Sequence, residues 1–449
     1  MSLISMLASL ALLCCNAEGN NPTDLGLENT AELVLVGSSK KDITPPPNLG
    51  IGMSGYSART GSFSGIHDRL YVRTLVITDQ DDGHTTIHCS IDQLSFASNH
   101  LRELYDRVTS EIDGLENIPI SNLFVTATHT HGGPSTVNRD NTENRNDIMF
   151  ESIKEAFQNR KAAQMRVGVT TVTNVNVNRQ NPHYGVHLGN FVCPLEINPA
   201  GDSDQDAHFI EFVGTDGLSI ASMFTFGVHS TVMGLHNLKI TGDLAGYASR
   251  YIEEHTNPDH ISLFLYSGGG DQSPIDRTQD AHLIDHVNTG VKAYGDRLGS
   301  QVLPAFQNGV FVQDVSISSI AMPLTLERDW QPQDDIPDTL ETVALYGIRY
   351  SDNVAVIATP FELFSATVKE LKKNSPFGHT LILSLTNGAR SYLAPESTYN
   401  RKPNSTRDDP EAALYTIDQC YENRTSIYTS GAEGEFVTKC TQLINDLKQ

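Results

Sequence analysis

The sequence predicts an α/β fold, in which a mixed β-sheet core is flanked by helices within a single large domain. Two observations support this fold class. From Leu33 onward, short β-branched runs alternate with amphipathic stretches, which is the pattern of strands that alternate with helices. The 449 residues contain no internal repeat, low-complexity tract or clear mid-chain linker, and a chain of this length can bury a large core.

The individual elements follow from local spacing. Residues 33–37 and 70–77 are β-branched runs that predict strands, and the Pro- and charge-rich residues 327–340 predict a loop. A first helix is expected behind Ser98 or Asn99 as its cap, and a third behind Asp243. Four sets of apolar residues recur at helical spacing: Leu101, Leu104, Val108 and Ile112; Ile148, Ile153, Ala156 and Phe157; Leu244, Tyr247, Ala248, Tyr251 and Ile252; and Phe436, Cys440, Leu443, Ile444 and Leu447.

The charge balance restricts the partners of the protein. There are 54 acidic and 31 basic residues, which gives a formal net charge of −23. Such a surface is repelled by nucleic-acid phosphates and by anionic lipid headgroups. We therefore expect no nucleic-acid partner and at most peripheral contact with a membrane. The sequence predicts no particular oligomeric state.

The N-terminus has the features of an export signal. Residues 3–15 form an apolar run that is shorter than the about 20 residues needed to span a bilayer but suits a signal peptide. Small residues around Ala17 predict cleavage there, so that 1–17 is a signal peptide, 18–32 a flexible linker and 33–449 the folded domain. The alternatives are a lipid anchor on Cys14 or Cys15, or a wrongly assigned start of the sequence. We expect a secreted, periplasmic or cell-surface protein.

Cysteines and sequons add conditional predictions. Four cysteines follow the leader, and in an exported protein we prefer a Cys420–Cys440 bridge because it closes the shortest loop. Cys89 lies in an apolar run and is expected to be a buried thiol. The absence of any CxxC spacing argues against a thiolate zinc site. Asn404 and Asn423 begin glycosylation sequons if the source is eukaryotic.

Two histidines in the string THTHGGP (128–134) give the strongest chemical signal. An apolar strand precedes them, and residues two apart on a strand face the same side, so His129 and His131 are expected to project together. Neutral imidazole nitrogens at a strand end are good zinc ligands. The alternative is a pair of histidines hydrogen-bonded at a loop edge. The spacing favours a metal.

Three further strings contain candidate residues that are ambiguous when taken singly. His229 closes another apolar run and is either a structural histidine or a third nitrogen ligand. Glu362 opens an amphipathic helix, where an acid is common because of the helix dipole, but a carboxylate would complete a His, His, Glu site. In SGGGDQSP (267–274), the glycines allow the backbone to approach a ligand closely. Ser273 there is a nucleophile, an oxyanion donor or a turn residue.

These strings, in this order, resemble the neutral and alkaline ceramidase family. The resemblance runs from about residue 33 to the C-terminus. The family typically continues into an immunoglobulin-like domain, which this chain is expected to lack. The family also typically has the string GDVSP where this sequence has GDQSP. Other blocks similar to those of the family are GSSKKDITPP (37–46), GIHDRLYVR (65–73), VNVNR (175–179), TGDLAGYA (241–248) and TNGARSY (386–392).

The resemblance implies a set of site residues. The zinc ligands would be His129, His229, Glu362 and Tyr392, of which the tyrosine follows from the resemblance alone. The pocket would be lined by four further residues that orient the substrate and stabilise the oxyanion: His131, Arg179, Ser273 and, as the best match to a second pocket tyrosine, Tyr421.

The resemblance also implies a reaction. Zinc would lower the pKa of a bound water, which attacks the N-acyl amide of a ceramide-like lipid to give a sphingoid base and a fatty acid. His131 would protonate the leaving amine. We favour Ser273 as an oxyanion donor over a nucleophile because no general base is assigned to it. Two alternatives are a zinc hydrolase acting on another small acylated substrate (a non-lipid amide, ester or lactone) and a non-catalytic binding protein on the same scaffold.

Overall fold

The fold is built around a large mixed sheet. The computed structural model of the chain describes residues 32–47, 50–135, 139–180, 185–187, 190–192, 197–275, 284–328, 340–398 and 421–449. Within them, a nine-stranded sheet has the order β13-β11-β10-β6-β1-β3-β4-β5, with β15 also paired to β6. The pairs β4–β5 and β11–β13 are parallel and the others antiparallel. The strands are β1 (Val34–Asp42), β3 (Tyr71–Asp79), β4 (Thr85–Ile91), β5 (Leu123–Ala127), β6 (Lys161–Thr171), β10 (Asp206–Gly214), β11 (Ser219–Phe226), β13 (Ile261–Tyr266) and β15 (Val310–Phe311).

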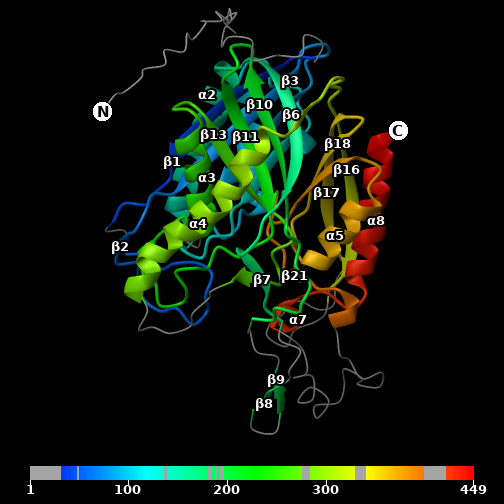
Figure 1. Cartoon of the computed structure of the whole chain (residues 1–449). Helices are drawn as coiled ribbons and strands as arrows, with labels where there is room; N and C mark the ends of the chain where they lie inside the picture. The colour runs from blue at the N-terminus through cyan, green and yellow to red at the C-terminus, as the bar shows by residue number, and fades with distance from the viewer. Residues whose placement is uncertain are drawn as a thin grey trace, which may run out of the picture.

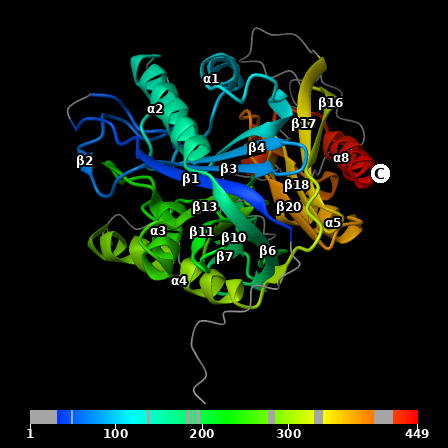
Figure 2. The ribbon, with the colours of Figure 1, turned by 90° about the horizontal axis from the view of Figure 1, so that it is seen from above.

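The sheet folds over on itself to give four layers. Strand β13 lies against β1, β3, β4 and β5, so the two halves of the sheet pack face to face. Helices α1 (Ser98–Glu111) and α2 (Arg139–Gln158) cover one outer face, and α3 (Asp243–Thr256) and α4 (Ile284–Phe306) cover the other, as Figure 2 shows. Because every strand at the centre has a covered face on both sides, its residues are apolar in nearly continuous runs.

Strand β3 illustrates how the pattern fills two cores. Leu75 and Ile77 point into the core between the two halves of the sheet. Val72 and Val76, at the alternate positions, point into the core beneath α1 and α2. All four are fully buried. Alternation of side chains along the strand therefore serves both layers.

A smaller sheet closes the open side of the sandwich. It has the order β16-β17-β18-β20, and α5 and α8 cover its outer face. Its inner face joins the core of the large sheet, where the Tyr350 hydroxyl lies 2.6 Å from His88 Nε2 and 2.9 Å from Thr86 Oγ1. The two sheets therefore share one core. The elements are β16 (Ser318–Glu327), β17 (Leu340–Ser351), β18 (Val354–Ala358), β20 (His379–Leu383), α5 (Ser365–Asn374) and α8 (Ala432–Lys448).

Short strand pairs and single turns connect these layers, and several gather at one end of the sheets. Strands β7 and β21 and helix α7 lie together there in Figure 1. The pairs are β2 (Gly65–Ile66) with β12 (Lys239–Ile240), β7 (Asn176–Asn178) with β14 (Gln272–Pro274), β19 (Glu362–Leu363) with β21 (Tyr392–Leu393), and β8 (Gly185–His187) with β9 (Asn190–Val192). The short helices are η1 (Ile120–Asn122), η3 (Glu396–Thr398) and α7 (Tyr421–Thr425).

The α/β fold class and the four predicted helices are confirmed, with differences at the caps. Helix α1 begins at Ser98 itself, behind Ala97. Helix α3 begins at Asp243, which adopts a φ of 51°, and its N-cap is Gly242. The Asp243 carboxylate accepts the N–H groups of Val232, Met233 and Leu244, so it joins the helix start to the preceding loop. The predicted signal peptide and most of the predicted loop 327–340 lie outside the described residues.

The cysteine prediction was wrong in one respect. Cys440 is a free thiol, fully buried on α8 among Leu443 and Leu447, so the preferred bridge to Cys420 is not formed. Cys420 itself lies outside the described residues. Cys89 is a free buried thiol, as predicted. None of the described helices is long and apolar enough to cross a membrane.

Candidate metal centre

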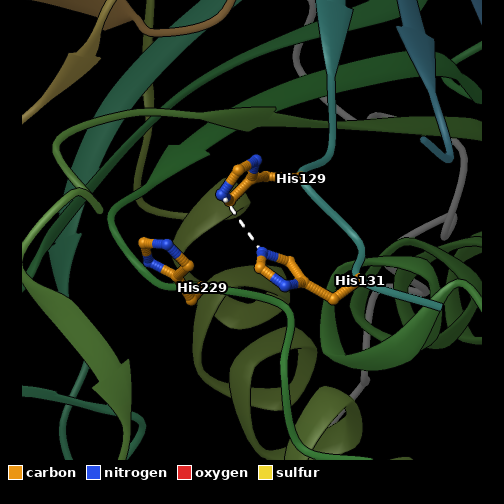
Figure 3. Close-up of side chains that lie close together, drawn as sticks. All are labelled: His129, His131 and His229. Atoms are coloured by element: carbon orange, nitrogen blue, oxygen red, sulfur yellow. Dashed lines mark hydrogen bonds between the residues drawn. The ribbon is translucent and has the colours of Figure 1, made fainter. Parts of the chain in front are cut away.

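The loop after β5 carries the first two histidines. The strand ends at Ala127, so His129 and His131 lie in the loop and not on the strand as predicted. They nevertheless converge, because His129 adopts a φ of 58° and turns the chain, and their Nε2 atoms lie 3.4 Å apart (Figure 3). The Nδ1 atom of His129 donates a hydrogen bond to the Leu94 carbonyl at 2.9 Å. In a neutral ring this bond leaves Nε2 unprotonated and able to bind a metal.

His229 reaches the same point from the loop after β11. This loop runs beside the first one through a bridge between Thr130 and Ser230. The His229 Nδ1 atom donates to the carbonyl of Gly269 at 2.7 Å, which again leaves Nε2 free for a metal. Burial, followed by the charge of Arg179, lowers the pKa of His229 well below its ordinary value, so the ring is neutral. Among the described residues, His129, His131 and His229 form a group whose ligand atoms lie within 4.8 Å of one another.

Two oxygen donors come from the C-terminal half of the chain. Glu362 and Tyr392 are direct partners in the parallel pair β19–β21. Glu362 Oε2 lies 3.3 Å from His129 Nε2 and 3.6 Å from His229 Nε2. The Tyr392 hydroxyl lies 3.4 Å from His229 Nε2. The prediction that Glu362 opens a helix was wrong: Glu362 lies in the short strand β19, and α5 begins three residues later, at Ser365.

This donor set fits a zinc ion. Two imidazole nitrogens, a carboxylate and a phenol oxygen meet at one point, and N and O donors in a group of three or four are the ligands of catalytic zinc sites. Glu362 Oε2 is buried and accepts no hydrogen bond in the described part of the chain. A buried carboxylate oxygen without a donor is costly, and a cation between it and the two Nε2 atoms would remove that cost.

Arg179 lies behind the phenol. It is almost fully buried, and its Nη2 donates to the Tyr392 hydroxyl at 3.2 Å and to the Gly270 carbonyl at 2.9 Å. Its Nε donates to Glu422 Oε1 at 2.7 Å. Burial alone would lower the pKa of Arg179, but the charges of Glu422 and Tyr392 outweigh it and raise that pKa, so the guanidinium stays charged.

The remaining predicted pocket residues also lie near this point. The Tyr421 ring stands edge-on to the Tyr392 ring, with centroids 6.1 Å apart. Ser273 lies in β14 opposite Val177, and its buried hydroxyl has no hydrogen-bond partner among the described residues. The residue before it, Gln272, accepts the backbone N–H of His229 at 3.1 Å.

The glycine run 268–270 allows the backbone to pack closely against Tyr266 and strand β19. A Cβ atom on Gly269 would lie 2.4 Å from the Tyr266 ring, and one on Gly270 would lie 2.9 Å from the Leu363 carbonyl. The close approach that was expected toward a ligand is therefore made toward Tyr266 and β19. It allows the Gly269 carbonyl to reach His229 and the Gly270 N–H to donate to Leu363.

Sequence reasoning missed three residues of the site. Glu422 holds the Arg179 guanidinium, and only its position beside Tyr421 pointed toward it. Tyr266 packs against His129 with ring centroids 4.9 Å apart, but it reads as one more residue of an apolar strand. Asp271 is buried between the Ser365 N–H and Asn178 Nδ2, and burial raises its pKa to about 7.

The sequon residue Asn423 is buried, and its amide donates to Thr398, so the folded chain does not offer it for glycosylation.

The family comparison covers the half of the chain that holds the histidines. Residues 34–282 match the family described as neutral/alkaline non-lysosomal ceramidase, N-terminal. A neutral ceramidase of Drosophila pseudoobscura pseudoobscura is 28% identical over 261 residues, and one of Pseudomonas aeruginosa is 27% identical over 254. Each match covers 53% of this chain and 36% of the relative. Neutral ceramidase A of Dictyostelium discoideum is 26% identical over 303 residues, 61% of this chain and 41% of the relative. The chain thus matches about two-fifths or less of these proteins.

Solved structures extend the likeness over most of the chain. The crystal structure of neutral ceramidase from Pseudomonas aeruginosa superposes with a TM-score of 0.71 at 17% identity, over 93% of this chain and 75% of that one. A structure described as a ceramidase complexed with C2 gives 0.72 at 16% identity, over 92% and 75%. At these identities the comparison shows a shared fold.

Proposed function

The chain belongs to the neutral/alkaline non-lysosomal ceramidase family, and from this premise we propose that it is a zinc-dependent amidohydrolase acting on ceramide-like lipids. The observation that carries the proposal is the convergence of His129, His229, Glu362 and Tyr392 from four separate segments onto one point. The two histidines come from the matched half of the chain, and the two oxygen donors come from outside it.

The four converging residues would hold the zinc. When bound, zinc would polarise an amide carbonyl and lower the pKa of water at the site. The backbone carbonyls of Leu94 and Gly269 would keep both imidazoles in the tautomer that presents Nε2.

The remaining residues would act on the substrate. Arg179, held by Glu422, would orient the substrate beside Tyr392. The buried hydroxyl of Ser273 would donate to the carbonyl oxygen as negative charge develops on it, a contact of the kind worth about 3–4 kcal/mol. His131, whose Nε2 faces His129, would supply the proton that the leaving nitrogen needs.

Hydrolysis of a defined ceramide tests the proposal. Release of fatty acid by the purified protein is measured with zinc, after chelation, and in His129→Ala. His255→Ala is the matched control, because His255 is exposed in the last turn of α3, where its Nδ1 binds the Tyr251 carbonyl at 2.8 Å and not a residue of the proposed centre. Zinc-dependent release that is lost in His129→Ala and retained in His255→Ala supports the proposal. One equivalent of zinc without cleavage would contradict ceramide as substrate and direct the search to small amides, esters and lactones.

We extend the proposal to export of the protein. It rests on the apolar residues 3–15 and the small residues before Glu18. The test is the mature N-terminus after expression in a host that exports proteins. A chain that begins at Glu18 agrees with cleavage after Ala17, a lipid-modified Cys14 or Cys15 indicates an anchor, and an intact N-terminus contradicts export by a cleaved signal.

A further inference from the structure

Arg59 joins three segments at the edge of the metal centre. Its guanidinium donates four hydrogen bonds, all to backbone carbonyls: to His131 at 2.7 Å, and to Ser54, Gly234 and Leu235 at 3.1 Å each. No ion pair with a carboxylate is recorded for Arg59 in the described part of the chain. The planar guanidinium can donate to several backbone carbonyls at once, which the ammonium group of a lysine does less well.

The segment that carries Arg59 also packs on the His131 ring. The Tyr56 ring stands edge-on to the imidazole, with centroids 4.8 Å apart. Gly55 has a φ of 103°, and a Cβ atom there would lie 2.4 Å from His131 Cγ and Nδ1. The backbone pairs with the loop after His131, through the Ser54 N–H to the Gly133 carbonyl at 3.1 Å and the Ser135 N–H to the Gly52 carbonyl at 2.8 Å.

The other two histidines are held by different elements. His129 Nδ1 binds the Leu94 carbonyl, and His229 Nδ1 binds the Gly269 carbonyl, and neither carbonyl belongs to the Arg59 segment. A change at Arg59 should therefore move the His131 ring most, because the His129 and His229 rings keep their bonds to the Leu94 and Gly269 carbonyls.

We propose that Arg59 is a positioning residue that acts through His131. By binding the His131 carbonyl and carrying Gly55 and Tyr56 against the ring, it sets the direction of the imidazole. The effect on catalysis rests on the function proposed above, in which His131 supplies a proton. The effect on the orientation of His131 does not depend on that function.

Arg59→Lys tests the proposal in two ways. In metal-free protein with ¹⁵N-labelled histidine, the His131 signals should shift or broaden most, with smaller changes at His129 and His229, whose rings lie 4.9 and 5.6 Å from the His131 ring. The signals are assigned by single His→Gln variants. In zinc-loaded protein, kcat on ceramide should fall about 100-fold, the cost of a misplacement of about 1 Å, with KM and zinc content nearly unchanged. Arg69→Ala is the control, since Arg69 is exposed and pairs only with Asp42 among the described residues.

A second variant keeps the test decisive if Arg59→Lys does not fold. Gly55→Ala leaves Arg59 intact and places a methyl group against the His131 ring, so it should displace the same NMR signals. Unchanged His131 signals in a folded Arg59→Lys, or equal shifts of all three histidines, would overturn the proposal. If the NMR effect appears but the wild type cleaves no ceramide, positioning stands and the proposed function fails.

Discussion

The buried ion pair between Arg179 and Glu422 gives the sharpest test of how the site is built. Both side chains are almost fully excluded from water, and the pair closes at 2.7 Å. Glu422 is the only carboxylate paired with Arg179 among the described residues. In Glu422→Gln the guanidinium keeps its bonds to Gly270 and Tyr392 but loses its counter-charge. Breaking a buried pair by removing one partner costs about 3–5 kcal/mol.

We therefore expect Glu422→Gln to lower the free energy of unfolding by about 3–5 kcal/mol, measured by urea unfolding at pH 7. Glu111→Gln is the matched control, because Glu111 pairs with Arg107 at 3.1 Å on the exposed face of α1. Exposed pairs of this spacing contribute about 0.3–0.5 kcal/mol. Two equal, small losses would refute the claim that burial makes the Arg179 pair different.

A double-mutant cycle separates the structural role of the pair from its role at the site. Arg179→Met with Glu422→Gln removes both charges, so the double variant should lose less stability than the two single variants together, by about 1–3 kcal/mol. Activity should not recover with stability, because Arg179 also holds the Tyr392 hydroxyl. Recovery of both would show that the pair supports the fold alone.

Three further predictions concern the centre itself. His131→Gln should lower kcat about 10²–10⁴-fold, the usual contribution of a general acid, with zinc retained at one equivalent, measured by steady-state kinetics and metal analysis; loss of zinc would make His131 a ligand. Removing a residue that supports a metal ligand from outside lowers metal affinity about 10–100-fold. Glu362→Gln changes a direct ligand, so it should weaken zinc binding by at least this factor, measured by chelator competition. Burial raises the pKa of Asp271 from 3.8 to about 7, so between these pH values the folded state keeps a proton that the unfolded chain loses. The contribution of the protonated Asp271 to stability is therefore complete below pH 4 and is lost as the pH rises through 7. Between pH 4 and 8 the wild type should lose about 4 kcal/mol of unfolding free energy relative to Asp271→Asn, and a pH-independent difference would contradict this.

The layers of the fold were predictable because their signals are local. Leu101, Leu104 and Val108 recur at helical spacing and are the buried residues of α1. The pairing of the sheet was not predictable, since the core face of β3 is decided by β13, which lies about 190 residues further along the chain and reveals its position only after folding. The predicted cap of α3 was wrong for a related reason. The Asp243 carboxylate accepts the backbone N–H groups of Val232 and Met233 in the preceding loop, a contact that forms only in the folded chain.

The candidate site divides in the same way. His129 and His131 could be selected from their spacing, although they meet through a left-handed residue in a loop and not through strand geometry. Tyr392 came from the family resemblance, and its physical basis appears only in the structure, in its register opposite Glu362 and in its hydroxyl 3.4 Å from His229 Nε2. Glu422 was missed because a buried acid beside a tyrosine has no spacing that distinguishes it from a surface acid. Its role appears only when α7 is placed against Arg179.

The two halves of the chain carry different evidence for the metal centre. The family match ends at residue 282, so it includes His129 and His229 but neither oxygen donor. The fold likeness continues over more than nine-tenths of the chain at 16–17% identity. A likeness of fold at this identity does not fix the direction in which the Glu362 and Tyr392 side chains point. In this chain they pair in register and direct their oxygens at the Nε2 atoms of histidines supplied by the first half. Leu363 of β19 and Leu393 of β21 pack in the same apolar core as the outer face of the small sheet. The fold of the second half therefore places the oxygen donors, and a variant that loosens this core should lose zinc before it loses the histidine arrangement.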